Sequence, residues 1–254
     1  MFLRRIAKAV AEQDWFVVLI ELVVVIVGIF VALQVAQWDD ARQERIGERH
    51  YLTRLQSDVQ SMIDWQTAER EWYTDHRSKV ATALNALQEC QLPGELKQTF
   101  DFMLVAHQSM PQLNVNRATY SEMVASGALS RIDNEPLKQQ IASTYSSADL
   151  IQSRIEYFSD DLGRAGNIIW RHVSFSIAPI EEYPQSWRDS IGVNGPYGIT
   201  VSYDFDALCA NIEFRNAIVE VYDSVDDRMN FAGYFEDELK KLGSLLEVEI
   251  QSSP

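Results

Sequence analysis

The feature that most constrains this chain is a run of apolar residues near its N-terminus. Residues 16–37 contain a single ionisable side chain, Glu21. As a helix that rises 1.5 Å per residue, this run extends about 33 Å, which matches the roughly 30 Å hydrocarbon core of a bilayer. Trp15 and Trp38 stand at its two ends, where indole rings favour the membrane interface. The run therefore predicts one transmembrane helix.

Two other interpretations of this run fit less well. A buried core helix is rarely so long and so uniformly apolar. A cleaved signal peptide has a shorter apolar region that ends at a small-x-small site, whereas this run continues into QVAQWDDARQER without a clear site. The apolar segment at 168–180 is too short for a second span and contains Arg171 and His172. We therefore expect a single-pass protein.

Basic residues on the two sides of the span bear on its orientation. Arg4, Arg5 and Lys8 lie among apolar residues in the N-terminal tail (1–15), as in a basic amphipathic segment on the anionic cytoplasmic face. Four arginines follow the span and oppose this orientation, namely Arg42, Arg45, Arg49 and Arg54. Because a short basic tail is awkward to translocate, we expect the N-terminus in the cytoplasm of a bacterium and a large domain in the periplasm.

The acidic charge of the chain makes nucleic acid an unfavourable partner. The net charge is −15, and residues 1–38 hold three basic and three acidic side chains, so the whole excess lies in the remainder. A surface this negative repels phosphate backbones. We expect an acidic extramembrane domain over 38–254, with the lipid bilayer and other proteins as partners.

The chain beyond the span is predicted to be almost entirely helical, which gives an all-α fold. Between residues 39 and 89 there is no proline, and apolar residues recur at steps of three, four and seven. This spacing is typical of a bundle or coiled-coil helix, although polar positions near 66–69 interrupt it. We expect one long helix from 16 to about 89, with Gly47 as the site of any bend, packed in an extramembrane helical bundle.

A Pro-Gly turn at 91–95 is expected to end the long helix. Gly127 is expected to end or interrupt a later helix, and Asn134 or Asp133 to cap another that has Pro136 in its first turn. Prolines, glycines and aromatic residues between 175 and 206 favour a long structured loop or a small hairpin. The remaining helices are expected at 95–109, 120–132, 134–173 and 204–251, with a loop at 110–119.

The two cysteines do not have the spacing of a metal or redox site. Cys90 and Cys209 could form one disulfide in an oxidising compartment. Because 119 positions separate them and nothing in the pattern relates them, we expect two unreactive thiols.

No pattern in the sequence predicts an enzyme, a metal or a cofactor. The chain lacks a phosphate-binding loop, a dinucleotide glycine pattern and a nucleophile elbow. The histidines are dispersed, without the i,i+4 pairing of helical zinc ligands. His172, Asp160 and Asp161 would be the best candidates for a hydrolase, but the acidic stretches 158–163 and 223–228 are expected to face solvent. Five aromatic residues are expected to pack between helices, namely Trp65, Trp72, Tyr73, Tyr145 and Tyr157.

Three segments resemble a bacterial family of single-anchor membrane proteins known only as a domain of unknown function. They are LIELVVVIVGIFVALQVAQWDDARQER, TYSEMVASGALSRIDNEPLKQQIASTY and DFDALCANIEFRNAI. The resemblance implies a terminal span with Gly and Gln that ends at Trp, followed by a helical region, and it implies no activity. The positions that carry it are Gly28, Gln34, Trp38, Tyr120, Ser126 and Gly127.

The apolar run also resembles the N-terminal helix of type IV pilins, in which a glutamate helps to align subunits in a filament. In that family a glycine stands five residues before the glutamate, and Phe16 occupies this place here. The helical remainder also lacks the strand-rich head of a pilin. A pilin-like filament component therefore stands as an alternative function.

Glu21 has three interpretations. It could be a tolerated side chain that snorkels or is protonated. It could face neighbouring copies, since it shares a helical face with Gly28, a small residue that allows close approach, and Gln34 offers another polar contact. It could also be an intramembrane proton site in an ion-conducting or motor-coupled subunit.

We expect the second role for Glu21, in a self-associating, membrane-anchored scaffold, accessory or sensor protein. Its bundle is similar to the sensing bundles of chemoreceptors, although those have a second span and a cytoplasmic output region. A membrane protein is a further expected partner.

Overall fold

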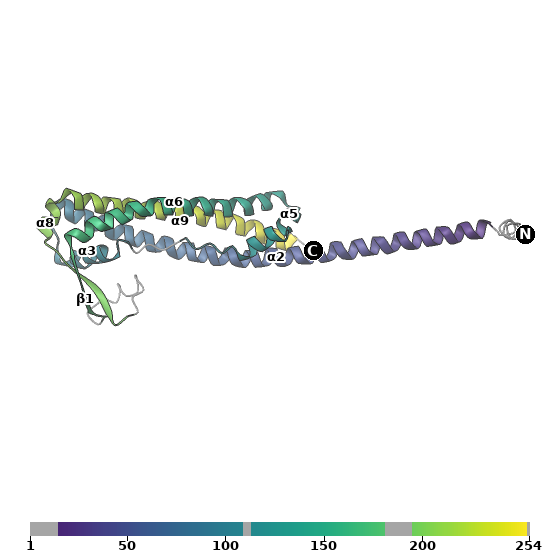
Figure 1. Cartoon of the computed structure of the whole chain (residues 1–254), viewed down its shortest axis with the longest axis horizontal. Coiled ribbons are helices and arrows are strands. Elements are labelled where there is room, and N and C mark those ends of the chain that lie inside the picture. Colours follow the sequence, from purple (N-terminus) through teal and green to yellow (C-terminus); the bar gives the residue numbers. More distant parts are fainter. Residues whose placement is uncertain (1–14, 109–112, 181–194, 253–254) are drawn as a thin grey trace, which may run out of the picture. The chain divides into compact units, whose positions relative to one another are not determined.

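The structure is a computed structural model, and it describes residues 15–108, 113–180 and 195–252. Helices form most of these ranges, together with one two-stranded sheet. Contacts divide the chain into two compact units, Met1–Tyr51 and Leu52–Pro254. The fold is all-α, with an N-terminal helix that continues into a helical bundle, as predicted (Figure 1).

Helix α2 (Trp15–Glu89) forms the described part of the first unit and continues into the second. Gly47 lies inside it without interrupting it. The helix ends where Cys90 adopts a positive φ of 50° and the Gln91 N–H donates to the Ala86 carbonyl at 3.0 Å. This bond closes a left-handed terminal motif, so the helix stops just before the predicted Pro-Gly turn.

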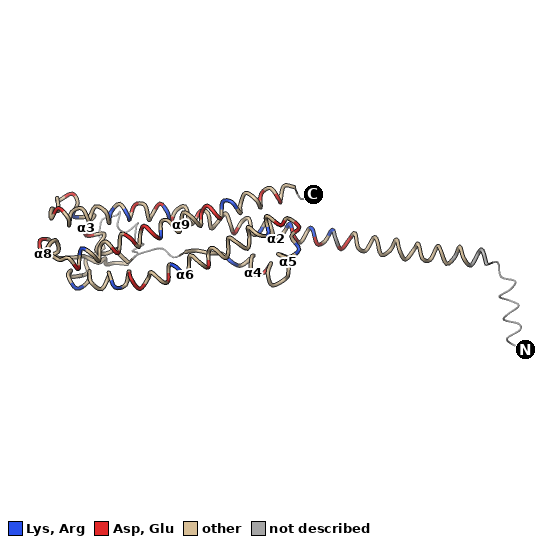
Figure 2. The backbone as a smooth tube through the Cα atoms, turned by 90° about the horizontal axis from the view of Figure 1, so that it is seen from above, with Lys and Arg blue, Asp and Glu red and all other residues tan. Residues whose placement is uncertain are grey.

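Two further long helices, α6 (Glu135–His172) and α9 (Ile212–Ser252), pack along the part of α2 that lies in the second unit (Figures 1 and 2). Helix α6 starts as predicted: the Leu137 N–H donates to the Asn134 side-chain oxygen at 3.1 Å, and proline occupies the first turn. Helix α9 runs in the opposite direction to α6.

Short helices connect these long ones. They are α3 (Gly94–Ala106), α4 (Ala118–Ala125), α5 (Ala128–Arg131) and α8 (Phe205–Ala210). Gly127 interrupts the expected helix at 120–132 because its φ of 73° is left-handed, a conformation that other residues rarely adopt. The single helix expected at 204–251 is wrong, since Asn211 is extended and accepts from the Phe214 N–H at 3.0 Å, which starts α9 separately.

The region expected to be a loop or hairpin contains an antiparallel hairpin of β1 (Ser174–Pro179) and β2 (Tyr197–Ser202). The register pairs Phe175 with Val201, Ile177 with Ile199 and Pro179 with Tyr197. Since opposite residues share a face, one face is apolar and the other carries only serine, threonine, alanine and glycine. The turn between the strands lies outside the described residues.

The core of the second unit follows the expected apolar stripe of α2. Buried residues recur along it at steps of three and four, from Leu52 to Leu87. They pack against α3, α6 and α9, with Phe100, Tyr145, Phe214 and Phe235 among the largest fully buried side chains. One heptad seam therefore organises the bundle.

The expectation of two free thiols is wrong. Cys90, directly after α2, forms a disulfide with Cys209 in α8, and their Cα atoms are 5.5 Å apart. The folded chain brings the end of α2 beside the short helix α8, a proximity that sequence spacing does not encode.

Three expectations about burial are also wrong. Trp65 and Tyr157 are exposed rather than packed between helices, whereas Tyr73 and Tyr145 are buried as expected. Arg228, at the end of a stretch expected to face solvent, is buried against α2 and α6. The hydrophobic spacing of α9 places residue 228 on the inward face, and this position outweighs the preference of an arginine for water.

Candidate functional site

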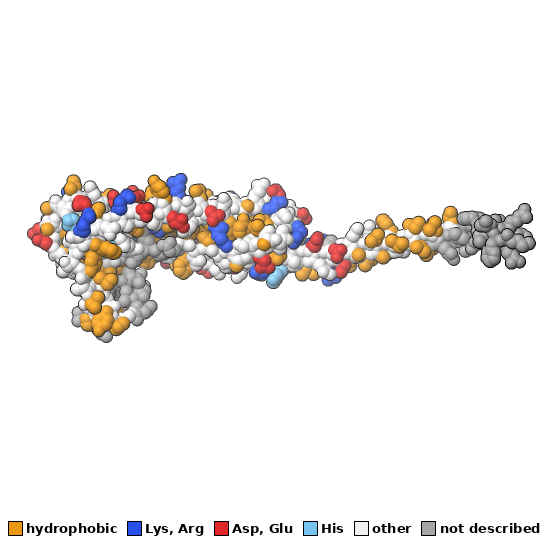
Figure 3. All heavy atoms as spheres, viewed as in Figure 1, with side chains coloured by type: hydrophobic (Ala, Val, Ile, Leu, Met, Phe, Trp, Pro, Cys, Tyr) orange, Lys and Arg blue, Asp and Glu red, His pale blue; other side chains and the backbone are white. Residues whose placement is uncertain are grey.

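The first unit carries an apolar belt on α2, which we define as residues 19–37. Every described large apolar side chain in it is exposed, from 45% for Ile20 to 64% for Val24. Figure 3 shows these side chains along the helix, and the sequence has no charged residue from Leu22 to Trp38. Of the described helices, α2 alone is long and apolar enough to cross a membrane, and none of its apolar window is buried within the protein.

The residues expected to mediate association lie on this belt. Gly28 and Gln34 are exposed, and a Cβ atom added at Gly28 would meet nothing within 4 Å. Glu21 lies in the same helix, seven residues before Gly28, so the two positions share a face. The structure describes the helical backbone at Glu21, but not the position of its side chain.

The residues expected to anchor the span are only partly described. Trp38 is 63% exposed, and Trp15 is the first residue of α2, where only the backbone is described. Arg4, Arg5 and Lys8 lie outside the described residues. The structure therefore places the belt itself but does not test the role of the basic tail.

The second unit holds a group of buried polar residues in the centre of the bundle. We call it the polar section and define it as Gln66, Glu69, Tyr73 and His76 of α2 with Arg228 of α9. All five are buried. The four residues of α2 occupy consecutive positions of the heptad seam, so four successive core layers are polar.

Glu69 is the acid of the polar section. It is 6% exposed, and its Oε2 atom has no hydrogen-bonding partner among the described residues. Burial raises the pKa of Glu69 to about 7, although the polar side chains of Gln66, Tyr73 and Trp65 and the charge of Arg228 lower it. Desolvation is therefore the dominant influence on this carboxyl.

Arg228 is the cation of the polar section, but it forms no close ion pair with Glu69. Its Nη2 donates to the Ser159 hydroxyl of α6 at 3.3 Å, and its Nη1 has no partner among the described residues. Burial raises the pKa of Tyr73, and the charge of Glu69 raises it further. Tyr73 thus stays a neutral phenol beside this acid and this base.

His76 extends the polar section toward α3. Its ring stacks on Trp72 with centroids 4.6 Å apart, and neither ring nitrogen has a partner among the described residues. Burial lowers the pKa of His76 to about 4, and Lys79 and His107 add to this effect. Burial also lowers the pKa of His107, whose Nδ1 donates to the Leu104 carbonyl at 2.7 Å. Both imidazoles are therefore neutral at pH 7.

Sequence analysis missed the polar section because it read these positions as an interruption of the apolar stripe. The signal was available, since Gln66, Glu69, Tyr73 and His76 continue the same steps of three and four from Met62 to Val80. Spacing, rather than residue type, marked these side chains as core.

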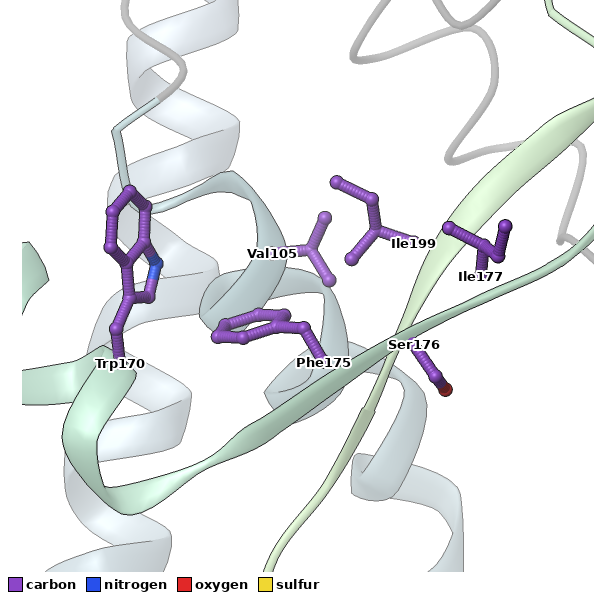
Figure 4. Close-up of a pocket in the computed structure, with 6 residues that line it drawn as sticks. All are labelled: Val105, Trp170, Phe175, Ser176, Ile177 and Ile199. Carbon is purple, nitrogen blue, oxygen red and sulfur yellow. The ribbon is translucent and has the colours of Figure 1, made fainter.

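A second feature of this unit is an apolar pocket of about 300 Å³ beside the hairpin (Figure 4). Val105 of α3, Trp170 of α6 and Phe175, Ile177 and Ile199 of the hairpin line it. Ser176 also borders the pocket, but its side chain points away, as its place on the opposite face of the hairpin requires. The lining suits an apolar surface and offers no charged side chain.

The residues considered for a hydrolase do not form a catalytic cluster. Asp161 pairs with Arg164, and the Asn211 side chain lies 3.2 Å from the His172 ring. His172 follows Asp160 and Asp161 by more than ten residues on one helix, a rise of about 17 Å. Among the described residues, no group of three His, Cys, Asp or Glu side chains could hold a metal ion.

Comparison of the chain with models of known protein families, with curated proteins and with solved structures gave no match.

Proposed function

We propose that this protein is a membrane-anchored helical scaffold, accessory subunit or sensor of a bacterial inner membrane, with its second unit in the periplasm. The exposed apolar belt of α2 carries the proposal. Full burial of a Val, Leu, Ile or Phe side chain is worth about 1.5–3 kcal/mol. A belt of more than ten such side chains, none of them covered by the protein, is far more stable in hydrocarbon than in water.

Self-association through the belt is the second part of the proposal. A small residue lets helices approach closely, and a polar group in hydrocarbon gains about 0.6–2 kcal/mol from an interhelical hydrogen bond. Glu21 and Gly28 share one face, and open space surrounds Gly28. A second copy of the helix would supply partners for Glu21 and Gln34.

The exposed face of the hairpin supports an interaction role for the second unit. Phe175, Ile177, Tyr197 and Ile199 are exposed on one side of two strands, a patch that Figure 3 shows in orange. Contiguous exposed apolar patches often mark binding surfaces. An anchored bundle with such a surface fits a scaffold or accessory subunit.

Membrane extraction tests the anchor directly. The full chain is expected to stay in the membrane pellet after a carbonate wash. A Val27→Lys variant should lose inserted protein, because a lysine at the helix centre costs about 3 kcal/mol. Gln43→Lys, an exposed change beyond the belt, is the matched control and should insert normally. Release of the unaltered chain as a soluble monomer would refute the proposal.

Reporter fusions at the C-terminus test the orientation. A reporter active only in the periplasm should give signal, and one that fluoresces only in the cytoplasm should not. The reverse result would place the second unit in the cytoplasm.

Cysteine cross-linking tests the association. Because Cys90 and Cys209 are paired, Gly28→Cys introduces one free thiol into the described part of the chain. We expect dimers from this variant under oxidation, and far fewer from Phe30→Cys, about 160° away on the same helix.

An ion-conducting or motor-coupled subunit is the alternative function, and Glu21→Gln separates the two. Association should survive this change because an amide still hydrogen-bonds, whereas proton transport through Glu21 would stop.

A further inference from the structure

We propose that the polar section is a proton-binding site, in which the buried Glu69 carboxyl is held in its protonated form by the folded second unit and its ionisation opposes the packing of that unit. The inference uses only contacts within that unit and does not depend on membrane anchoring.

The position of the polar section makes its protonation state matter for stability. Met62 on one side and Val80 on the other continue the seam with fully buried apolar side chains. The polar section is therefore bounded by apolar core layers on both sides along the seam. A buried polar group without a partner is costly, and a buried charge without one is far more costly.

The groups that face Glu69 do not neutralise its charge. Tyr73 and the polar side chains of Gln66 and Trp65 lie on its own helix, and α9 contributes Arg228. Helix α6 contributes the Ser159 hydroxyl, which is bound to Arg228. An ionised Glu69 therefore requires either a shift of the Arg228 side chain or entry of water.

A second buried glutamate, Glu236, shows how ion pairs change the balance. Glu236 of α9 accepts from Lys240 at 2.6 Å and from Thr67 at 3.0 Å, and Arg70 lies 3.2 Å away. Desolvation opposes its ionisation, but these partners outweigh it and hold the pKa of Glu236 below its ordinary value. Glu69 is also buried, but its polar neighbours on α2 are neutral and no cation of the described residues forms an ion pair with it, so the two glutamates respond to pH differently.

The proton balance is simple. Below neutrality Glu69 is a neutral carboxylic acid, which can both donate and accept a hydrogen bond within the polar section. Above neutrality the proton passes to solvent and leaves a carboxylate that the desolvated core disfavours. The free energy of unfolding therefore falls as pH rises from 4.5 to about 7, because in this range the unfolded chain ionises Glu69 while the folded unit keeps it protonated.

Thermal unfolding of the full chain in detergent micelles tests the inference. The Tm of Glu69→Gln should exceed that of the wild type by a margin that grows from pH 5 to about pH 7 and is constant above it, because the amide cannot ionise. Glu71→Gln, an exposed change on the same helix, should match the wild type at every pH. Asp227→Asn is a second control, since burial also raises the pKa of this half-buried carboxyl.

Two further measurements make the test specific. The Tm gain from Glu69→Gln should also be measured in the presence of Arg228→Met. There it should keep growing to a higher pH than in the wild-type background, because the positive charge of Arg228 favours the ionised form of Glu69. Infrared difference spectra of the wild type between pH 6 and pH 8 should show the loss of the signal of a protonated carboxyl group. The Asp227→Asn variant should show the same loss. A Tm margin independent of pH, or no such carboxyl signal, would overturn the inference.

Discussion

The two parts of helix α2 are equally helical but use apolar residues in opposite ways. In the belt of the first unit, successive apolar side chains point to every side and all of those described are exposed. In the second unit, from Leu52 to Leu87, apolar side chains recur at steps of three and four, and that seam is buried. One helix thus carries two patterns suited to two different surroundings.

The difference shows that burial, and not helicity, distinguishes the two units. A helix that is apolar on all sides needs an apolar solvent or a complete protein coat, whereas a seam needs only neighbouring helices on one side. Polar residues follow the same division. Gln34 of the belt has no cover within the protein, whereas Gln66 and Glu69 lie inside the bundle.

The largest expected effect comes from the same substitution in the two parts of α2. Leu55→Ala should lower the free energy of unfolding of the second unit by about 2–5 kcal/mol, because Leu55 is fully buried in the seam. Leu33→Ala, in the exposed belt, should leave it unchanged. Urea unfolding of both variants in micelles measures the contrast, and equal losses would mean that the belt also packs within the domain.

Removal of the disulfide should act on one unit alone. The Cys90→Ser/Cys209→Ser double variant should lower the stability of the second unit by about 2–4 kcal/mol, since the bond closes a long loop. Its retention in membranes after a carbonate wash should match the wild type. A variant that is released from membranes would show that the units depend on each other.

The buried acid and imidazole should give opposite pH slopes, each about 1.4 kcal/mol per pH unit. The raised pKa of Glu69, from 4.5 to about 7, means that stability falls as pH rises through this window. The lowered pKa of His76, from 6.5 to about 4, means that stability falls as pH drops through its window. Between pH 4.5 and 6.5 the slopes of Glu69 and His76 oppose each other.

Single variants should uncover these slopes. With Glu69→Gln, urea unfolding should show stability that rises from pH 4.5 to 6.5, and with His76→Gln it should fall over the same range. His50→Gln, an exposed change in the first unit, is the control and should give the same curve as the wild type. Parallel curves for all three variants would contradict the burial of both groups.

The smallest expected effect concerns a helix cap in the second unit. Asn134→Ala should lower stability by about 1 kcal/mol, because it removes the acceptor for the Leu137 N–H. It also removes a hydrogen bond of 2.5 Å to Glu249 at the end of α9. Asn134→Asp, which keeps the cap oxygen but adds a charge beside Glu249, separates the two contributions. Equal stability of Asn134→Ala and the wild type would show that the cap is replaced by water.

Much of the fold could be predicted because its signals are local. The apolar run, the steps of three and four, the Asn134 cap with Pro136 and the left-handed Gly127 all act within a few residues of where they stand in the chain. The break at Asn211 was missed because the same side chain can lie within a helix or cap one, and its neighbours decide which.

The candidate sites divide in the same way. The belt and its residues Gly28 and Gln34 follow from sequence, because a long uncharged run has few alternatives. The polar section does not follow from sequence, since the charge of Arg228 in α9 acts on Glu69 in α2, more than 150 residues earlier in the chain. The apolar pocket likewise requires α3, α6 and the hairpin to come together.

By itself, the sequence determined which segments are helical and which one is too apolar for water, since backbone hydrogen bonding and hydration depend on residues near one another. Only the tertiary structure decided that Cys90 meets Cys209, that Arg228 is buried and that Glu236 forms ion pairs with Arg70 and Lys240. The reason is physical: pairing and desolvation depend on distance in space, and helix packing sets that distance.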